Sequence, residues 1–222
     1  MKTALLNEAS LARARRDTFY YYNFAELAAH ESEGLDWTRE LRRTPDSDLA
    51  HIAIHGGGIE AGTTEAADAA AGDNHNYYSF RGKKKASGNR DLHITSSRFD
   101  EPRCVALQRD MVRTVSWHGF HGTDKVTEIG GLDQDFKQWV KRSLLHAGFS
   151  IIDAAFERSG SNPQNICNQN LSGRGVQLEL STAQRAAFFR NGDLSAINRS
   201  NVTAEFSDYI EAIQLAYRRL RA

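Results

Sequence analysis

The sequence predicts an α/β fold in which helices cover both faces of an at least partly parallel sheet. Segments with strand character alternate along the chain with segments of helical periodicity, as happens when helices connect the strands of one sheet. Hydrophobic residues make up 40% and charged residues 25% of the 222 residues, as in an ordinary globular domain. The length suits one domain, and no linker interrupts it. We therefore expect a single domain over residues 1–222, with residues 1–45 as an N-terminal edge region.

Strands are expected where apolar residues cluster or alternate with polar ones. The segment 49–55, LAHIAIH, places Ile52 and Ile54 on one face of a buried strand. The segments 112–117, VRTVSW, and 176–180, VQLEL, alternate with the two-residue period of a strand. Shorter candidates complete the sheet, at 77–80, 92–96 and 150–154.

Helices are expected where helix formers or helically spaced apolar residues lie between capping residues. The first, EAADAAA, lies between a cap at Thr63-Thr64 and a stop at Gly72. In the second, Pro102 occupies the first turn, a position that proline favours. The other expected helices lie between Asp133 and Gly148, near 182–190, and from Thr203 onward.

The charge balance disfavours several classes of protein. Lys+Arg and Asp+Glu both number 28, whereas proteins that bind nucleic acids or membrane surfaces are usually basic. No segment approaches the roughly 18 apolar residues that span a bilayer, and charges interrupt the N-terminus where a secretory signal would need an apolar run. Cys104 and Cys167 supply no disulfide framework. We therefore expect a monomer in a reducing compartment, with no nucleic-acid or membrane partner.

Two histidines and a glutamate gather near strand ends. His55 ends the first strand, Glu60 follows across the turn Gly56–Gly58, and His118 ends another strand. In open α/β sheets ligands bind outside the carboxyl ends of the strands, and two histidines plus one carboxylate are a common set for catalytic zinc. A lone histidine at a strand end is more often structural. HGGG also occurs in esterase oxyanion loops, but the chain lacks the G-x-S-x-G nucleophile motif.

Two further features can be interpreted either as functional or as solvated surface without a function. Glu179 lies on the polar face of its strand beside Gln177, where it is either solvated or, next to a zinc-bound water, a general base. The run from Arg81 to Arg90 holds five cations. Such a run is usually a solvated loop, but it also attracts polyanions, and the planar fork of Arg90 suits a carboxylate.

Several motifs together resemble the poly-γ-glutamate hydrolase family of bacteriophages and bacteria. The resemblance extends from about residue 22 to 190, and the order of AIHGGGIE, LHITS-x-x-FDEP and GVQLELS is specific. The matching segments are YNFAEL (22–27), EGLDW (33–37), AIHGGGIEAGTTE (53–65), GNRDLHITSSRFDEP (88–102), SWHGFHG (116–122), GGLD (130–133), NICNQ (165–169) and GVQLELS (175–181).

The resemblance implies a zinc peptidase of carboxypeptidase-like fold, with a twisted mixed sheet flanked by helices. It implies that His55, Glu60 and His118 bind Zn²⁺ and that Glu179 is the catalytic carboxylate. Members of the family hydrolyse the γ-amide bonds of poly-γ-glutamate, a polymer of some bacterial capsules. A phage protein of this kind stays in the cytoplasm until lysis releases it to the outside.

The resemblance also suggests residues that bind the substrate. Zinc carboxypeptidases hold a substrate carboxylate with an Asn-Arg pair, which corresponds here to Asn89-Arg90. The family pattern expects Asn-Arg at 168–169, but this chain has Asn168-Gln169. Arg174, Arg90 or Arg81 is then expected to replace the missing arginine, with Asn168 still at the substrate.

Other histidines and other functions remain as alternatives. His121 competes with His118 as a ligand, whereas His93 is expected to place its loop and His51 to pack within its strand. The first alternative function is a zinc amidase or peptidase acting on another γ-glutamyl or peptidoglycan amide. The second is a non-catalytic module that binds a polyanion or nucleic acid.

Overall fold

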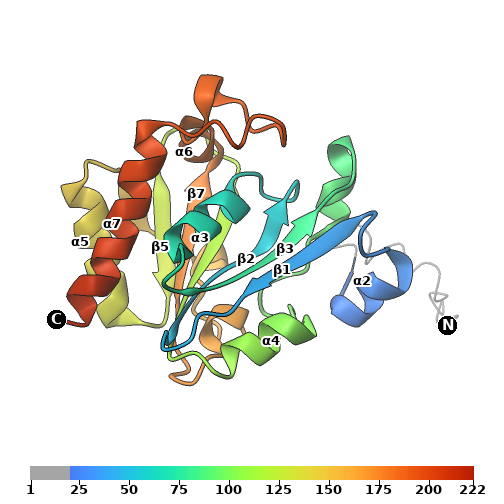
Figure 1. Cartoon of the computed structure of the whole chain (residues 1–222), viewed down its shortest axis with the longest axis horizontal. Helices are drawn as coiled ribbons and strands as arrows, with labels where there is room; N and C mark the ends of the chain where they lie inside the picture. Colours follow the sequence, from blue (N-terminus) through green and yellow to red (C-terminus); the bar gives the residue numbers. More distant parts are fainter. Residues whose placement is uncertain (1–20) are drawn as a thin grey trace, which may run out of the picture.

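One mixed sheet forms the centre of the fold, and the computed structural model describes residues 21–222 (Figure 1). Within these residues the sheet has seven strands, in the order β1-β3-β2-β4-β7-β5-β6. The four central strands β3, β2, β4 and β7 are parallel, whereas β1 and β5 run antiparallel to the central strands that they flank, and β6 is parallel to β5. The strands are β1 (Trp37–Arg42), β2 (Leu49–Gly57), β3 (Asn76–Gly82), β4 (Arg113–Phe120), β5 (Thr127–Gly131), β6 (Ile151–Asp153) and β7 (Val176–Ser181).

Helices cover both faces of the sheet, which confirms the predicted fold class. The edge strand β1 and helix α2 lie at one end of the molecule, with α5 and α7 at the other (Figure 1). Part of the predicted edge region, residues 1–20, lies outside the described residues. The α-helices are α2 (Phe24–His30), α3 (Thr63–Ala71), α4 (Pro102–Gln108), α5 (Gln134–His146), α6 (Thr182–Ala187) and α7 (Ala204–Leu220). Short 3₁₀ segments are η1 (Ala86–Leu92), η2 (Phe156–Arg158), η3 (Ile166–Asn168) and η4 (Arg190–Gly192).

Two hydrophobic cores lie on the two faces of the sheet. The larger core packs α3, α5 and α7 against one face, and the smaller one packs residues of α2 and α4 against the other. Side chains along β7 alternate between the two faces of the sheet, and Val176, Leu178 and Leu180 all enter the larger core. Gln177 and Glu179 therefore face the opposite side. None of the described helices has the length and apolarity that crossing a membrane requires.

Capping side chains define where most of the predicted helices begin. Asp133 accepts a hydrogen bond from Phe136 N at the start of α5, and Thr203 accepts one from Phe206 N at the start of α7. Glu101 caps α4 by accepting from Arg103 N and Cys104 N. These caps satisfy amide groups that have no partner within the first turn of a helix.

The structure corrects three local predictions. The segment 92–96 is not a strand. Leu92 ends η1, residues 93–95 have no regular secondary structure, and the alternating apolar residues Leu92 and Ile94 are buried in the smaller core. Strand β5 was not expected, because TEIGG holds a single large apolar residue. Helix α3 is capped not by Thr63 but by Gly62, whose φ of 98° favours glycine.

The turn after β2 depends on a glycine that is tightly enclosed. Gly57 has a φ of 65°, and a Cβ atom there would lie 2.5 Å from the Gly82 carbonyl oxygen. The next residue, Gly58, donates a backbone hydrogen bond to the same oxygen at 2.9 Å. The turn therefore requires both a left-handed conformation and close approach of two backbones.

We expect Gly57→Ala to destabilise the protein more than Gly173→Ala, measured as the free energy of unfolding in urea. Gly173 has a φ of 66°, but no atom would lie within 4 Å of a methyl group added there, so it reports the conformational cost alone, about 1–2 kcal/mol. Gly57→Ala adds the displacement of Gly82, a further 1–3 kcal/mol or so. Equal losses in the two variants would contradict the close backbone contact.

Candidate active site

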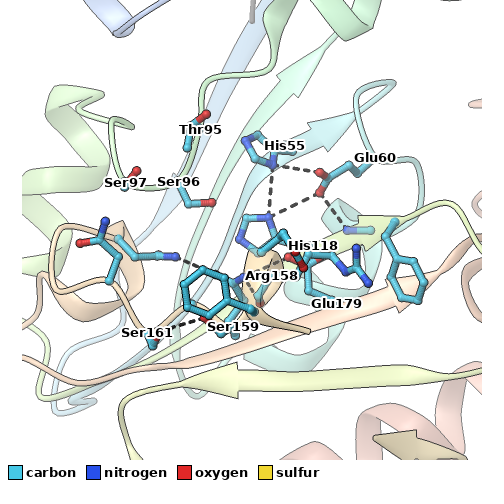
Figure 2. Close-up of a pocket in the computed structure, with 18 of the residues that line it drawn as sticks. His55, Glu60, Thr95, Ser96, Ser97, His118, Arg158, Ser159, Ser161 and Glu179 are labelled. Atoms are coloured by element: carbon cyan, nitrogen blue, oxygen red, sulfur yellow. Dashed lines mark hydrogen bonds and ion pairs between the residues drawn. The ribbon is translucent and has the colours of Figure 1, made fainter. Parts of the chain in front are cut away.

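A polar pocket lies at the carboxyl ends of β2, β4 and β7, where the sequence predicts the site (Figure 2). Its volume is about 630 Å³. Strand ends contribute His55 and His118, and the loop after β2 contributes Glu60. Glu179 of β7, together with Glu157 and Arg158 of η2, adds further charged groups to the lining. Figure 2 shows the two imidazoles and Glu60 pointing toward one another, with Glu179 and Arg158 beside them.

A β-bulge brings His55 to the correct face of the sheet. Strict alternation would place His55 on the face of Ala53, toward the larger core. The register of β2 against β3 shifts between Ala53 and Gly56, and such a shift interrupts the alternation. As a result the Nδ1 atoms of His55 and His118 are 3.2 Å apart.

The glycine turn folds Glu60 back onto the two histidines. Glu60 N donates to the His55 carbonyl at 2.8 Å and closes the turn. Its Oε1 lies 3.0 Å from His55 Nδ1, and its Oε2 lies 3.6 Å from His118 Nδ1. Oε2 also accepts a hydrogen bond from Gly119 N at 2.9 Å. The predicted trio of His55, Glu60 and His118 is thus brought together.

The pKa of Glu60 reflects the positive charge that this site favours. Burial acts to raise the pKa, but the imidazoles of His55, His118 and His93, which stabilise the carboxylate when they carry a proton toward it, outweigh burial and hold the pKa well below its ordinary value. The carboxylate is therefore ionised although only 12% of the side chain is exposed, and such a position favours a cation nearby.

The hydrogen-bonding pattern of the imidazoles fits a metal ion. His55 Nε2 lies 2.7 Å from the Ile94 carbonyl, which can only accept. In the form of the ring that binds a metal, Nε2 therefore carries the proton and Nδ1 is a bare lone pair. That lone pair faces Glu60 Oε1, a second acceptor. His118 Nε2 contacts Ser116 Oγ at 2.8 Å and likewise leaves Nδ1 toward the others. Zinc sites typically combine a carboxylate with imidazole ligands, and each imidazole ring is oriented by a hydrogen bond to its other nitrogen.

A third imidazole, His93, also lies at this site. Its ring stacks on His55 with centroids 3.7 Å apart, and its Nε2 lies 3.6 Å from Glu60 Oε1. His55, Glu60 and His93 offer ligand atoms within 4.8 Å of one another. The sequence predicts only a loop-placing role for His93, because its segment has the alternation of a strand. His121, the predicted rival of His118, is exposed and does not line the pocket.

Glu179 lies beside this cluster with a strongly perturbed carboxyl group. It pairs in register with His118 on the adjacent strand, and its Oε1 accepts a hydrogen bond from Gln177 Nε2 at 3.0 Å. Burial and the nearby Glu60 raise the pKa of Glu179 well above its ordinary value, which Arg158 partly offsets. A buried carboxyl with a raised pKa at a pocket wall is a candidate acid–base group.

The buried Arg185 ties the site's loops together behind the pocket. Its guanidinium donates to the carbonyls of Ala61, Leu180 and Phe120 at 2.7, 3.2 and 3.3 Å. These bonds join the loop after Glu60 to the ends of β7 and β4. A Cβ atom at Gly119 would lie 2.5 Å from the guanidinium, so the glycine in WHG makes room for it. No sequence motif singled out Arg185.

The cationic run is not part of the pocket lining. Arg81 pairs with Glu40 on the edge strand β1, Arg90 is exposed on η1, and Arg174 is exposed in the loop before β7. None of these arginines, proposed from the sequence as substrate contacts, lines the pocket. The pocket instead contains Arg158, which was not predicted from the sequence.

The two predicted asparagines are buried and support neighbouring backbone. Asn89 Nδ2 donates to the Lys84 carbonyl at 2.5 Å, behind the glycine turn. Asn168 Nδ2 donates to the carbonyls of Gly160 and Asn162 at 2.8 and 3.0 Å, and both of those residues line the pocket. Asn168 thus shapes a pocket wall without lining the pocket itself. His51 is buried as expected, accepts a hydrogen bond from Trp117 Nε1, and has its pKa lowered by burial to about 3.

Similar proteins include phage and Bacillus proteins. A structure of a bacteriophage poly-γ-glutamate hydrolase superposes with a TM-score of 0.88 at 38% identity, covering 91% of this chain and 98% of that one. A structure of zinc-free YndL superposes with a TM-score of 0.83 at 32% identity, covering 90% and 98% of the two chains. The SPbeta prophage-derived protein YoqZ of Bacillus subtilis (strain 168) is 36% identical over 212 residues, which are 95% of this chain and 74% of YoqZ.

These similarities confirm the family predicted from the motifs and the mixed α/β sheet. Both structures are covered almost completely, so the shared fold includes the strands that carry the pocket. A family model described as poly-gamma-glutamate hydrolase matches residues 21–212. The chain therefore belongs to the poly-γ-glutamate hydrolase family.

Proposed function

We propose that this protein is a zinc-dependent hydrolase that cleaves the γ-glutamyl amide bonds of poly-γ-glutamate. The observation that carries the proposal is the convergence of two imidazole Nδ1 atoms, 3.2 Å apart, on the carboxylate of Glu60, with Glu179 one strand away. Membership of the family supports the substrate class. The similarity to a protein whose structure is described as zinc-free supports the choice of metal.

In this proposal His55, Glu60 and His118 hold the zinc ion. Zn²⁺ would polarise the scissile carbonyl and lower the pKa of a bound water toward ~7. His93 is the competing third ligand, because its Nε2 lies as near Glu60 as His118 Nδ1 does, at 3.6 Å. Ser116 and the Ile94 carbonyl orient the two strand-end imidazoles from behind.

Glu179 moves the proton in this proposal. As a general base it takes a proton from the attacking water, and as a general acid it delivers that proton to the leaving amine. The raised pKa of Glu179 suits this exchange, because a carboxyl whose pKa lies nearer neutrality both accepts and releases a proton readily. Gln177 restricts the carboxyl by donating to Oε1.

One incubation tests the proposal. Purified protein is mixed with poly-γ-glutamate, with and without a chelator, and the polymer length is followed by size-exclusion chromatography. We expect the polymer to shorten, the chelator to stop the reaction, and added Zn²⁺ to restore it. Muropeptides serve as the competing amide substrate. An intact polymer with cleaved muropeptides would overturn the substrate, and chelator-resistant cleavage would overturn the role of the metal.

A further inference from the structure

The pocket of this protein is rich in acidic groups and has one strong cation. Glu60, Glu157 and Glu179 all line it. Within the part of the chain that the structure describes, Arg158 is the only lysine or arginine in the lining. Poly-γ-glutamate carries a free α-carboxylate on every residue, so it meets electrostatic repulsion unless a cation receives it. Arg158 is the group placed to do this.

Arg158 is held in one orientation by a buried carboxylate. Its Nε and Nη2 donate to Glu128 at 3.0 and 2.6 Å, and the Glu128 side chain is only 5% exposed. Ala155 N donates to the same carboxylate at 3.1 Å. Burial acts to raise the pKa of Glu128, but hydrogen bonds from Arg158 and Ala155 outweigh it and lower that pKa. A two-point hydrogen bond of this kind fixes the plane of a guanidinium.

The free edge of the guanidinium is available to a ligand in the pocket. The hydrogen bonds to Glu128 use Nε and Nη2 and leave Nη1. The Arg158 guanidinium carbon lies 4.7 Å from the centre of the Phe120 ring, which supports it from a second side. With 36% of its side chain exposed, Arg158 is open to solvent, unlike its anchor.

The anchor places Arg158 beside the proposed base. Glu128 of β5 lies directly opposite Glu179 of β7 in the antiparallel register, and the charge of Arg158 acts on Glu179. Figure 2 shows Arg158 next to Glu179 and His118, with Thr95, Ser96 and Ser97 on the other side of the pocket. A carboxylate bound by Arg158 would therefore lie close to the reacting amide.

We propose that Arg158 binds the α-carboxylate of the glutamyl residue at the scissile γ-amide, with Glu128 as its positioning residue. Arg158 is then the residue that selects γ-linked acidic chains over neutral amides. The inference rests on the proposed function and deepens it, because it assigns the recognition of the substrate's charge to one side chain. It also moves this role from Arg90, which is exposed outside the pocket.

The test compares two substrates and several variants. One substrate is poly-γ-glutamate, and the other is the same polymer with its α-carboxylates converted to amides. We expect Arg158→Gln to raise KM for the acidic polymer by about 10–100-fold and to remove the preference over the amidated polymer. Arg158→Lys keeps the positive charge but loses the planar guanidinium, so we expect its KM to lie between those of the native protein and Arg158→Gln. Arg142→Gln is the matched control, because it removes one positive charge from the exposed surface of α5. It should change neither KM nor the preference for the acidic polymer.

A double variant separates binding from structure. Arg158→Gln leaves Glu128 as a buried carboxylate without its cation, which costs stability. Glu128→Gln/Arg158→Gln removes both charges, so we expect its melting temperature to recover while KM stays high. Recovery of KM together with the melting temperature would show that Arg158 is structural and overturn the inference.

A binding measurement distinguishes this inference from the proposed function. Calorimetry with a short γ-glutamyl oligomer in the presence of chelator reports affinity without turnover. Oligomer binding that weakens at least tenfold in Arg158→Gln supports the inference even if the native protein fails to cleave the polymer. Unchanged affinity overturns the inference even if the native protein cleaves it, and no binding at all to the native protein overturns it as well.

Discussion

Glu179→Gln is expected to lower kcat by about 10²–10⁴-fold while leaving the zinc content unchanged. The amide of glutamine has nearly the shape of the carboxyl group but cannot take a proton from water. The substitution also leaves the proposed zinc ligands in place, because Glu179 contributes none of them. Its melting temperature should not fall, since the native carboxyl is buried with a raised pKa and gains little from ionisation.

Steady-state kinetics on poly-γ-glutamate and elemental analysis of zinc check this result together. Glu157→Gln is the matched control, because Glu157 also lines the pocket but is exposed. We expect the control to retain its kcat within a factor of about three, since exposed charges act weakly across water. Full turnover by Glu179→Gln would remove Glu179 from the proton transfer.

His55→Ala is expected to abolish both bound zinc and turnover. The imidazole of His55 is within 3.2 Å of both other proposed ligand groups, so the remaining pair would hold the metal much more weakly. Zinc per chain, measured by elemental analysis after gel filtration, should fall from about one toward zero. The loss of activity in this variant should follow from the loss of the metal.

Three further histidine variants sharpen the assignment. His121→Ala removes an exposed imidazole that does not line the pocket, and it should keep its zinc. His118→Ala should lose zinc, whereas His93→Ala should retain it. Zinc lost from His93→Ala and kept by His118→Ala would exchange these two residues in the ligand set. Full zinc in His55→Ala would remove the proposed centre altogether.

The sequence was sufficient to predict the trio at the site because each member belongs to a readable local pattern. His55 and His118 end apolar or alternating segments, which become β2 and β4, and Glu60 follows a run of glycines that becomes the turn. Strand ends in an α/β sheet meet at one edge, so these patterns indicate a common location. Glu179 was readable for the same reason, since VQLEL alternates strictly and becomes β7.

Arg158 could not be found in this way. Its orientation comes from Glu128, and β5 has too little apolar character for its sequence to indicate a strand. The residue itself ends the short 3₁₀ segment η2, which is held by hydrogen bonds to Glu128 of β5 and Gln177 of β7 rather than by local preference alone. The substrate-binding arginines were predicted in the run at 81–90 instead, because a sequence shows where positive charges cluster but not where each side chain points.

The position of His93 at the site could not be predicted for a related reason. The alternation of Leu92 and Ile94 predicted a strand, but these side chains enter the smaller core from the end of η1 and the irregular stretch that follows it. A buried apolar pair has the same sequence signature in both cases. This stretch brings the Ile94 carbonyl to His55 Nε2 and the His93 ring onto His55, so one segment both orients a proposed ligand and offers another.

The bulge in β2 makes the spacing of residues, as well as their chemistry, a requirement of the site. Between Ala53 and Gly56 the strand contains one residue more than its partner, and this extra residue is what turns His55 toward His118. With regular pairing in place of the bulge, His55 would share the face of Ala53 and point toward the larger core, although every ligand would still be encoded. An insertion or deletion that abolished the bulge would therefore disable the site without replacing any of its ligands.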